Sequence, residues 1–518
     1  MRENGPAANS DSKSAPLSRA VIIAVLAASL MVGAFAISNQ SYWIDEATSL
    51  IVAMAPSPSE AWRYAQAVGG STIQMPLYNV YLYAWHKIFG GGEWAMRASN
   101  IPFFLFAQLA FLFLLRARPR LALSASVLAL LCPTLWMYLD EARPYIMQYA
   151  AACWLTAALL RAARPVSPPD KWTRTEIFLL ALATIMLAGS SLLGVLWAAG
   201  FVLTLLWLKH NPDGREGGKW PVALYLGILA FPLLALAVFY ALTFERAGSG
   251  YFRPGTGLVS LPYVVYEFLG FSGFGPGRLE LRGAPVAALR AHLLSLLPLA
   301  AVLGVLALFA WQYLRAQRPD RRIILAFLLA VVAPALVAVA GMVFSDYRPL
   351  PRHFMPVLPT VILGLSALLP AALAQRSLVF RAAAVMLPLL WLSSSLNLRW
   401  RGAHAKDDYR TASAIAAAAL RENKEVWWAA DAAAAFIYLT PVALENVPGR
   451  AWAMQAPQWD DIRFKFPPRV IVISKPDIYD PSGAVARYAG ENRFVPALKL
   501  HAFTILTREN DPLPAIAP

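Results

Sequence analysis

The sequence predicts an all-α polytopic membrane domain followed by a C-terminal α/β domain outside the membrane. Of the 518 residues, 58% are apolar and only 14% are charged, and the mean hydropathy is +0.51. A soluble domain is nearer half apolar and a quarter charged, so lipid is the main solvent of this chain. The two cysteines, Cys132 and Cys153, both lie in apolar runs, which excludes a disulfide scaffold or a zinc cluster.

Eleven apolar runs approach the roughly 20 residues that a helix needs to cross the hydrocarbon core. They lie near 18–38, 99–115, 121–139, 143–162, 176–190, 192–208, 220–243, 289–314, 322–343, 353–374 and 380–398. The fifth and sixth runs are divided at 189–191, because one helix over both would overshoot the bilayer by about half. We expect about eleven transmembrane helices within residues 18–398, after a disordered cytoplasmic tail at residues 1–17.

The arginines and lysines of the short loops set the direction of these spans. One alternating set of loops carries sixteen of them, whereas the other set offers only Arg348 and Arg352. The rich set is expected in the cytoplasm, which puts the N-terminus inside and the C-terminus outside. The net charge of +15 is therefore mostly a topology signal, and it gives no support to a nucleic-acid partner. The first run, 21–37, ends without a cleavage signal and is expected to be an anchor.

Two long loops and the C-terminal region lie on the external side in this scheme. The first loop, 39–98, contains an aromatic segment at 75–89 with the composition of a helix in the membrane interface. The second loop, 244–288, is rich in glycine, and we expect a flexible flap. Residues 399–518 alternate strand-like runs with charged helical stretches, which predicts a small α/β domain. It has no glycine-rich phosphate loop, so no nucleotide is assigned.

Ionisable residues gather at the external ends of three spans and could line one pocket, because these ends share one membrane face. They are Asp45 and Glu46 after the first span, Glu141, Arg143 and Tyr145 after the third, and Arg352 and His353 before the tenth. Each also has a simpler interpretation. The acids could be a helix boundary, the arginines could anchor lipid headgroups, and His353 could be an ordinary helix-start residue.

The motif around Asp45, Tyr42–Trp43–Ile44–Asp45–Glu46–Ala47, resembles the GT-C superfamily of polytopic glycosyltransferases. These include protein O-mannosyltransferases, aminoarabinose transferases acting on lipid A and oligosaccharyltransferase catalytic subunits. The likeness continues in residues 75–78, 89–93 with Arg97, 141–145 and 352–356. It departs at His353, where tyrosine is more usual, and at Gln74–Met75, where histidine or a second proline is common. The resemblance implies that Asp45 is the catalytic acidic residue.

The acids fit sugar transfer at an external site. A charged nucleotide sugar does not cross hydrocarbon, so the expected donor is a sugar on a polyprenyl phosphate. Asp45 would then be the general base that takes the proton of an acceptor hydroxyl, in a single displacement that inverts the anomeric centre. Glu46 or Glu141 would orient the acceptor or position Arg143.

The cations fit the departing phosphate, which arginine binds through forked, charge-assisted hydrogen bonds. Arg143 and Arg352 are the expected phosphate ligands, with Tyr145 and His353 as further donors. We expect no obligatory cofactor. A divalent metal, bound by Asp45 and Glu141, is the alternative.

Taken together, the sequence predicts an integral-membrane glycosyltransferase, a hexosyl or pentosyl transferase with a lipid-phosphate sugar donor. Its acceptor would be a lipid, glycan or protein of the cell envelope, as in lipopolysaccharide or glycan modification. We expect it in the bacterial inner membrane with a periplasmic C-terminal domain at 399–518. The alternatives are a transporter or flippase of lipid-linked glycans, and a non-enzymatic membrane assembly protein.

Overall fold

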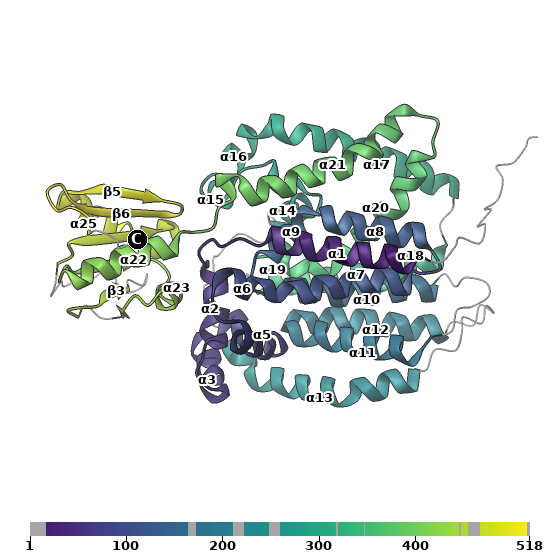
Figure 1. Ribbon diagram of the computed structural model, residues 1–518, viewed down its shortest axis with the longest axis horizontal. Helices are drawn as coiled ribbons and strands as arrows, with labels where there is room; N and C mark the ends of the chain where they lie inside the picture. The colour runs from purple at the N-terminus through teal and green to yellow at the C-terminus, as the bar shows by residue number, and fades with distance from the viewer. Residues whose placement is uncertain are drawn as a thin grey trace, which may run out of the picture.

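The computed structural model describes residues 17–163, 172–210, 222–247, 260–317, 320–345, 348–444, 447–453 and 467–514. Long helices run side by side in a bundle, and a smaller domain containing the strands lies beyond one end of that bundle (Figure 1). Most of the tail expected at residues 1–17 lies outside the described residues.

Nine helical segments of the described chain are long and apolar enough to cross a membrane. They are α1 (Arg19–Ala36), α6 to α7 (Glu93–Leu114), α10 (Tyr145–Ala163), α12 (Leu192–His210), α13 (Val222–Ala247), α17 (Leu293–Gln317), α18 to α19 (Arg321–Phe344), a short 3-10 helix with α20 (Pro351–Leu373), and α21 (Leu378–Trp400). The protein is thus a multi-pass membrane protein.

The two remaining apolar runs are also helical. Helices α8 (Pro119–Leu131) and α9 (Pro133–Leu139) meet at a 59° bend and together form a tenth candidate span. Proline at position 133 explains the break, because its ring cannot continue the preceding helix. Helix α11 (Arg174–Ser190) has only 17 residues and packs between α10 and α12.

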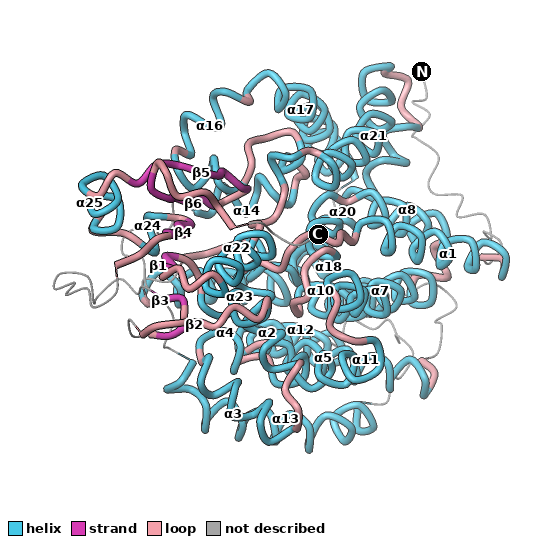
Figure 2. The backbone as a smooth tube through the Cα atoms, turned by 60° about the vertical axis from the view of Figure 1, so that its left-hand side comes forward, coloured by secondary structure: helices cyan, strands magenta, loops and turns pink. Residues whose placement is uncertain are grey.

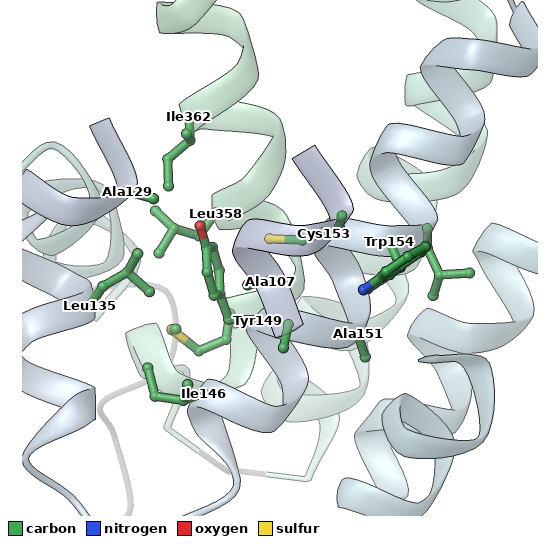
Figure 3. Packing of buried hydrophobic residues seen from close by; sticks show 14 of the residues in the cluster. Ala107, Ala129, Leu135, Ile146, Tyr149, Ala151, Cys153, Trp154, Leu358 and Ile362 are labelled. Carbon is green, nitrogen blue, oxygen red and sulfur yellow. The ribbon is translucent and has the colours of Figure 1, made fainter. Parts of the chain in front are cut away.

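Helix α10 lies at the centre of the bundle, in contact with α7, α11 and α12. Its side chains are buried along almost the whole length. Figure 3 shows Tyr149 among Leu135 of α9, Leu358 of α20 and Ile146 of α10 itself. The many alanines of α10 allow neighbouring helices to approach closely, which is how helices associate where water provides no driving force.

Short helices cover the end of the bundle nearest the strand-containing domain (Figure 1), and we call this end the loop face. They are α2 (Ile44–Ala53), α3 (Pro58–Val68), α4 (Gly70–Ile73), α5 (Pro76–Phe89), α14 (Leu261–Phe268), α15 (Arg278–Gly283) and α16 (Pro285–Ala291). Helix α5 corresponds to the segment expected in the interface and is not among the candidate spans.

The expectation of a flexible flap at 244–288 is wrong for its described C-terminal half, which forms α14 and α15. Pro262 near the start of α14 is compatible with a helix N-terminus, where the missing N–H is not needed. Glu280 starts α15 by accepting the backbone N–H of Gly277. Residues 248–259 lie outside the described part.

The C-terminal domain contains a six-stranded mixed sheet in the order β2-β3-β1-β4-β6-β5 (Figure 2). The strands are β1 (Val426–Ala429), β2 (Val442–Ala443), β3 (Ala451–Ala453), β4 (Val470–Ser474), β5 (Phe494–Leu500) and β6 (Phe503–Arg508). β2, β3, β1 and β4 are parallel, whereas β6 pairs antiparallel with β4 and β5.

Helices cover both faces of this sheet. Trp428 and Val472 point into one core with α22 (Tyr409–Arg421) and α23 (Ala432–Ile437). Trp427 and Ile471 point to the opposite core, with α25 (Ala484–Glu491). This alternation is the two-residue period of a strand buried on both sides, and it confirms the mixed α/β structure predicted after the last span.

Candidate active site

Helix α2 carries Asp45 and Glu46 in its first turn, and the two carboxylates have different surroundings. Successive residues of an α-helix point about 100° apart. The Asp45 side chain is 24% exposed and faces Arg352, whereas the Glu46 side chain is 0% exposed and points into the protein. Only Asp45 is therefore positioned to meet a ligand directly.

The structure brings the three segments singled out in the sequence together at the loop face. A guanidinium nitrogen of Arg352 pairs with the Asp45 carboxylate. Arg143 Nη1 donates to the backbone carbonyl of Asp45 at 3.1 Å and to Ser49 Oγ at 2.7 Å. Its Nη2 donates to Ser71 Oγ at 3.0 Å. Two arginines from distant parts of the chain thus contact the same acidic residue, Asp45.

Opposing effects act on the pKa of the Asp45 carboxyl. Burial raises this pKa, but the positive charges of Arg352 and Arg143 together lower it by more than burial raises it. The pKa of Asp45 therefore lies below its usual value of 3.8. Asp45 is consequently ionised at neutral pH and can accept a proton. The geometry pairs a charged base with cations suited to a phosphate.

Glu46 is held in a buried ion pair. Its two oxygens accept hydrogen bonds from Arg97 Nε and Nη2, each at 2.8 Å. One oxygen also accepts the backbone N–H of Ala142 at 2.9 Å, and Lys406 Nζ lies 3.1 Å from the other. Burial alone would raise the pKa of Glu46, but Arg97 and Lys406 lower it to about 2.

Arg97 connects this ion pair to the end of α1. Its Nη1 donates to the carbonyls of Ser38 at 3.0 Å and Gln40 at 2.7 Å. Asp140 lies beside it, accepting the Ser38 hydroxyl at 2.9 Å. These contacts fix the first turn of α2, and hence Asp45, relative to the bundle. The sequence motif includes Arg97, whereas the contacts of Asp140 in this network were not predicted from the sequence.

Glu141 faces a different arginine from the one that Asp45 faces. Its side chain is 1% exposed, and Oε1 lies 2.9 Å from Arg278 Nη2 of α15. The Arg278 guanidinium also stacks over the Trp43 ring at 5.1 Å. Glu267 of α14 is buried nearby, and burial raises its pKa to about 7, with Arg278 acting against and Glu141 adding to that shift. Sequence reasoning missed Arg278 and Glu267, since both lie inside the glycine-rich loop 244–288, which showed no helical pattern.

The raised pKa of Glu267 predicts a loss of stability as pH rises. The folded protein keeps this proton up to about pH 7, whereas an unfolded glutamate releases it near its usual value of 4.5. Stability is therefore fullest below pH 4.5 and falls by on the order of 2–3 kcal/mol through pH 7. Thermal unfolding is measured at pH 5 and at pH 7.5 for the wild type and for Glu267→Gln. The loss of stability between the two pH values is expected to be smaller in Glu267→Gln than in the wild type. An unchanged difference would contradict the shift.

The two remaining candidates have structural contacts. His353 Nδ1 accepts the backbone N–H of Leu350 at 3.1 Å, and the carbonyl of His353 accepts Trp197 Nε1 at 3.3 Å. The Tyr145 ring lies 6.0 Å from the Arg143 guanidinium, and its hydroxyl lies 3.5 Å from Arg143 Nε. Tyr145 thus lies beside the Arg143 guanidinium. The ring of His353 caps the start of the helical segment that carries Arg352, because its Nδ1 binds the backbone N–H of Leu350.

The architecture matches solved structures of known proteins. A structure of ArnT from Cupriavidus metallidurans in the apo state covers 94% of this chain and 97% of its own, with a TM-score of 0.53 and 13% identity. The structure of the same protein bound to undecaprenyl phosphate covers 96% and 100%, with a TM-score of 0.53 and 14% identity. This chain has the fold of ArnT. The likeness to ArnT extends over both the bundle and the C-terminal domain. No protein-family model matches the sequence, and no curated protein matches it.

Proposed function

We propose that the protein is an integral-membrane glycosyltransferase that moves a sugar from a polyprenyl-phosphate donor to a hydroxyl of a cell-envelope acceptor. The observation that carries this proposal is the ionised carboxylate of Asp45 paired with Arg352, while Arg143 binds the backbone carbonyl of the same residue. The fold shared with ArnT, whose structure was solved with undecaprenyl phosphate, supports this donor class. The loop face is then the periplasmic side of a bacterial inner membrane, in agreement with the arginine-rich loops of the opposite end.

The reaction is a single displacement in which Asp45 takes the proton of the acceptor hydroxyl. The acceptor oxygen forms a bond to the anomeric carbon as the bond to the phosphate oxygen breaks, and the leaving electron pair stays on that oxygen. Attack opposite the leaving group inverts the anomeric centre. Arg352 and Arg143 neutralise the released phosphate through charge-assisted hydrogen bonds. A general base in this position contributes about 100- to 10,000-fold in rate.

Glu46 and Glu141 are proposed to position the site rather than to touch substrate. Glu46 is completely buried, and its oxygens are bound by Arg97, Ala142 and Lys406. It therefore fixes the helix that carries Asp45. Glu141 holds Arg278 against the same loop face.

Cationic side chains, in this proposal, replace an obligatory metal. Asp45 and Glu141 pair with different arginines. Among the described residues, no three histidine, cysteine, aspartate or glutamate side chains gather in a group that could hold a metal ion. We therefore derive no step through a divalent cation.

Mass spectrometry of envelope glycolipids and glycans, with and without the gene product, tests the proposed function. A cell lacking the protein is expected to lose the mass of one sugar residue from one acceptor. The mass difference would identify the sugar and the acceptor together. An unchanged set of glycan masses under conditions where the protein is expressed would contradict the proposal.

Arg352→Ala is expected to weaken binding of undecaprenyl phosphate about 10- to 100-fold, the value of one or two lost charge-assisted hydrogen bonds. Affinity is measured on the purified full-length protein in nanodiscs. Arg63→Ala is the matched control, since Arg63 is an exposed arginine of the same loop face that pairs with Glu60. Equal affinity of Arg352→Ala and wild type would exclude Arg352 as a phosphate ligand.

A further inference from the structure

The segment that joins the bundle to the C-terminal domain touches the candidate active site. This segment, residues 401–408, runs from the end of α21 to the start of α22 (Figure 1), and we call it the domain linker. The backbone N–H of Lys406 donates to Gln40 Oε1 at 2.8 Å. Ser41 Oγ donates to the carbonyl oxygen of Asp407 at 3.0 Å. The domain linker thus lies along the chain that leads from α1 into α2.

The ammonium group of Lys406 lies between two carboxylates. Its Nζ is 3.1 Å from Glu46 Oε2 and 3.6 Å from Asp140 Oδ2, and it also donates to the backbone carbonyl of Asp140. The Lys406 side chain is only 12% exposed. Together with Arg97, which pairs with Glu46 at 2.8 Å and approaches Asp140 at 3.8 Å, these groups carry no net charge. Removing the Lys406 charge would leave one buried negative charge uncompensated, which is costly.

The two residues after Lys406 bind the C-terminal domain instead. The carboxylate of Asp407 pairs with Lys475, which directly follows β4, and the two side chains are 10% and 7% exposed. Asp408 caps α22, and its backbone N–H donates to the carbonyl of His501 between β5 and β6 at 3.0 Å. Three consecutive residues therefore connect Glu46 and Asp140 with the sheet and the first helix of the C-terminal domain.

The path of the domain linker is also set by other parts of the loop face. A Cβ atom at Gly277, just before α15, would lie 2.0 Å from the carbonyl oxygen of Ala403. A side chain would not fit there, so glycine allows the domain linker to pack directly against this loop. Just beyond the domain linker, Arg410 Nη2 donates to Glu93 Oε1 at 2.6 Å. The position of Lys406 is therefore fixed by contacts on both sides of it.

Helix α2 is held between the bundle and the C-terminal domain. Ala47 is completely buried in a core with residues of α22, α23 and β4, and Ile44 packs against this core. From the bundle, Arg143 binds the backbone carbonyl of Asp45 at 3.1 Å. Glu46 follows Asp45 in the first turn of α2, so a shift of Glu46 would move Asp45 as well. A reacting group displaced by about 1 Å can lose about 100-fold in rate.

We propose that Lys406 is a positioning residue of the transfer reaction. Through Lys406, the C-terminal domain holds the first turn of α2 in the orientation that points Asp45 toward Arg352. Lys406 does not touch substrate, because its ammonium group is bound by Glu46 and Asp140. This inference rests on the proposed function and gives the C-terminal domain a part in it, since the active site is complete only when the domain linker is in place.

Replacing Lys406 tests this role in the full-length protein. Lys406→Met has a similar length and no charge, and it is expected to reduce the sugar-modified acceptor in cells about 10- to 100-fold per amount of folded protein. The affinity of the purified protein for undecaprenyl phosphate is expected to stay within about twofold, because Arg352 and Arg143 are unchanged. Lys406→Arg keeps the charge and should retain most of the modification. Lys424→Met is the matched control, since Lys424 is an ion-paired lysine of the same domain that binds Asp511.

A double-mutant cycle separates positioning through Glu46 from a general loss of stability. In the double variant Glu46→Gln with Lys406→Met, Arg97 still has Asp140 as its counter-ion, so no charge of the group is left unpaired. If Lys406 acts through Glu46, adding Lys406→Met to Glu46→Gln should cost less than about threefold further modification per folded protein. A further loss as large as that of Lys406→Met alone would overturn the proposal.

The remaining outcomes also decide the matter. Full modification by Lys406→Met would overturn the positioning role, as would equal losses in Lys406→Arg and Lys406→Met. A loss of undecaprenyl phosphate affinity of about 10-fold or more would overturn it too, because Lys406 would then act on the donor. If Lys406→Met is not recovered as folded protein, Lys406→Gln replaces it. Asp45→Asn, assayed alongside, separates the two proposals. Retained modification in Asp45→Asn contradicts the transferase itself, whereas retention in Lys406→Met alone contradicts only the positioning role.

Discussion

Asp45→Asn is expected to reduce sugar transfer about 100- to 10,000-fold, the contribution of a general base. Asparagine has nearly the same shape as aspartate and still offers an oxygen to Arg352, so the loop face should keep its structure. It cannot take a proton from the acceptor hydroxyl. The loss should therefore fall on turnover, with expression and affinity for undecaprenyl phosphate close to the wild-type values.

Two quantities are measured: the amount of sugar-modified acceptor in cells, by mass spectrometry, and the affinity of the purified protein for undecaprenyl phosphate. Glu60→Gln is a matched control, since Glu60 is a partly exposed carboxylate of the same loop face that pairs with the exposed Arg63 and accepts the Ser57 hydroxyl. If Asp45→Asn retains the modification, Asp45 is not the base. Movement of the lipid-linked donor across the membrane by a protein that transfers no sugar would favour a flippase.

Glu46→Gln is expected to destabilise the protein by about 3–5 kcal/mol, the cost of removing one partner from a buried ion pair. Both Glu46 and Arg97 have 0% exposed side chains, so Arg97 would keep its charge without its main counter-ion. Thermal unfolding of the purified protein measures this loss. The double variant Glu46→Gln with Arg97→Met is expected to recover part of the stability, because no charge is then left unpaired.

The same ion pair predicts a dependence on pH. The pKa of Glu46 is about 2 in the folded protein, below its usual value of 4.5. A lowered pKa gives stability that is complete above pH 4.5 and is lost as pH falls toward 2. The wild type should therefore lose stability over this range, and Glu46→Gln should lose less. Equal slopes in the two proteins would show that Glu46 is not held in this way.

The bundle could be predicted from the sequence because lipid imposes a long apolar run on every span. Each of the eleven expected runs is helical, although α11 is short and α8 and α9 are bent. The charge rule also placed Asp45, Arg143 and Arg352 at one end of the bundle, where the structure finds them. Hydrophobic runs and loop charges are properties of whole segments, so the spans and their direction can be predicted without knowledge of tertiary contacts.

The direction of individual side chains could not be predicted. Asp45 and Glu46 are adjacent in sequence, yet one meets Arg352 and the other is enclosed by Arg97. The two side chains point in different directions because successive residues of a helix are rotated about its axis. Which way each one points depends on the tertiary contacts on each side of α2. The partners Arg278 and Lys475 were missed for a related reason, since short helices and strands of four or five residues carry too little pattern to show which loop they approach.

The placement of α2 between two cores has a consequence for biosynthesis. Ala47 belongs to the core of a domain whose strands are translated much later, and Lys406 reaches Glu46 across 360 residues of chain. At roughly 5–20 residues per second, the ribosome needs about 20–70 seconds to produce that partner. During this interval the outward side of α2 stays uncovered and Glu46 lacks one of its cations. The first turn of α2, with Asp45, thus reaches its final surroundings only near the end of translation.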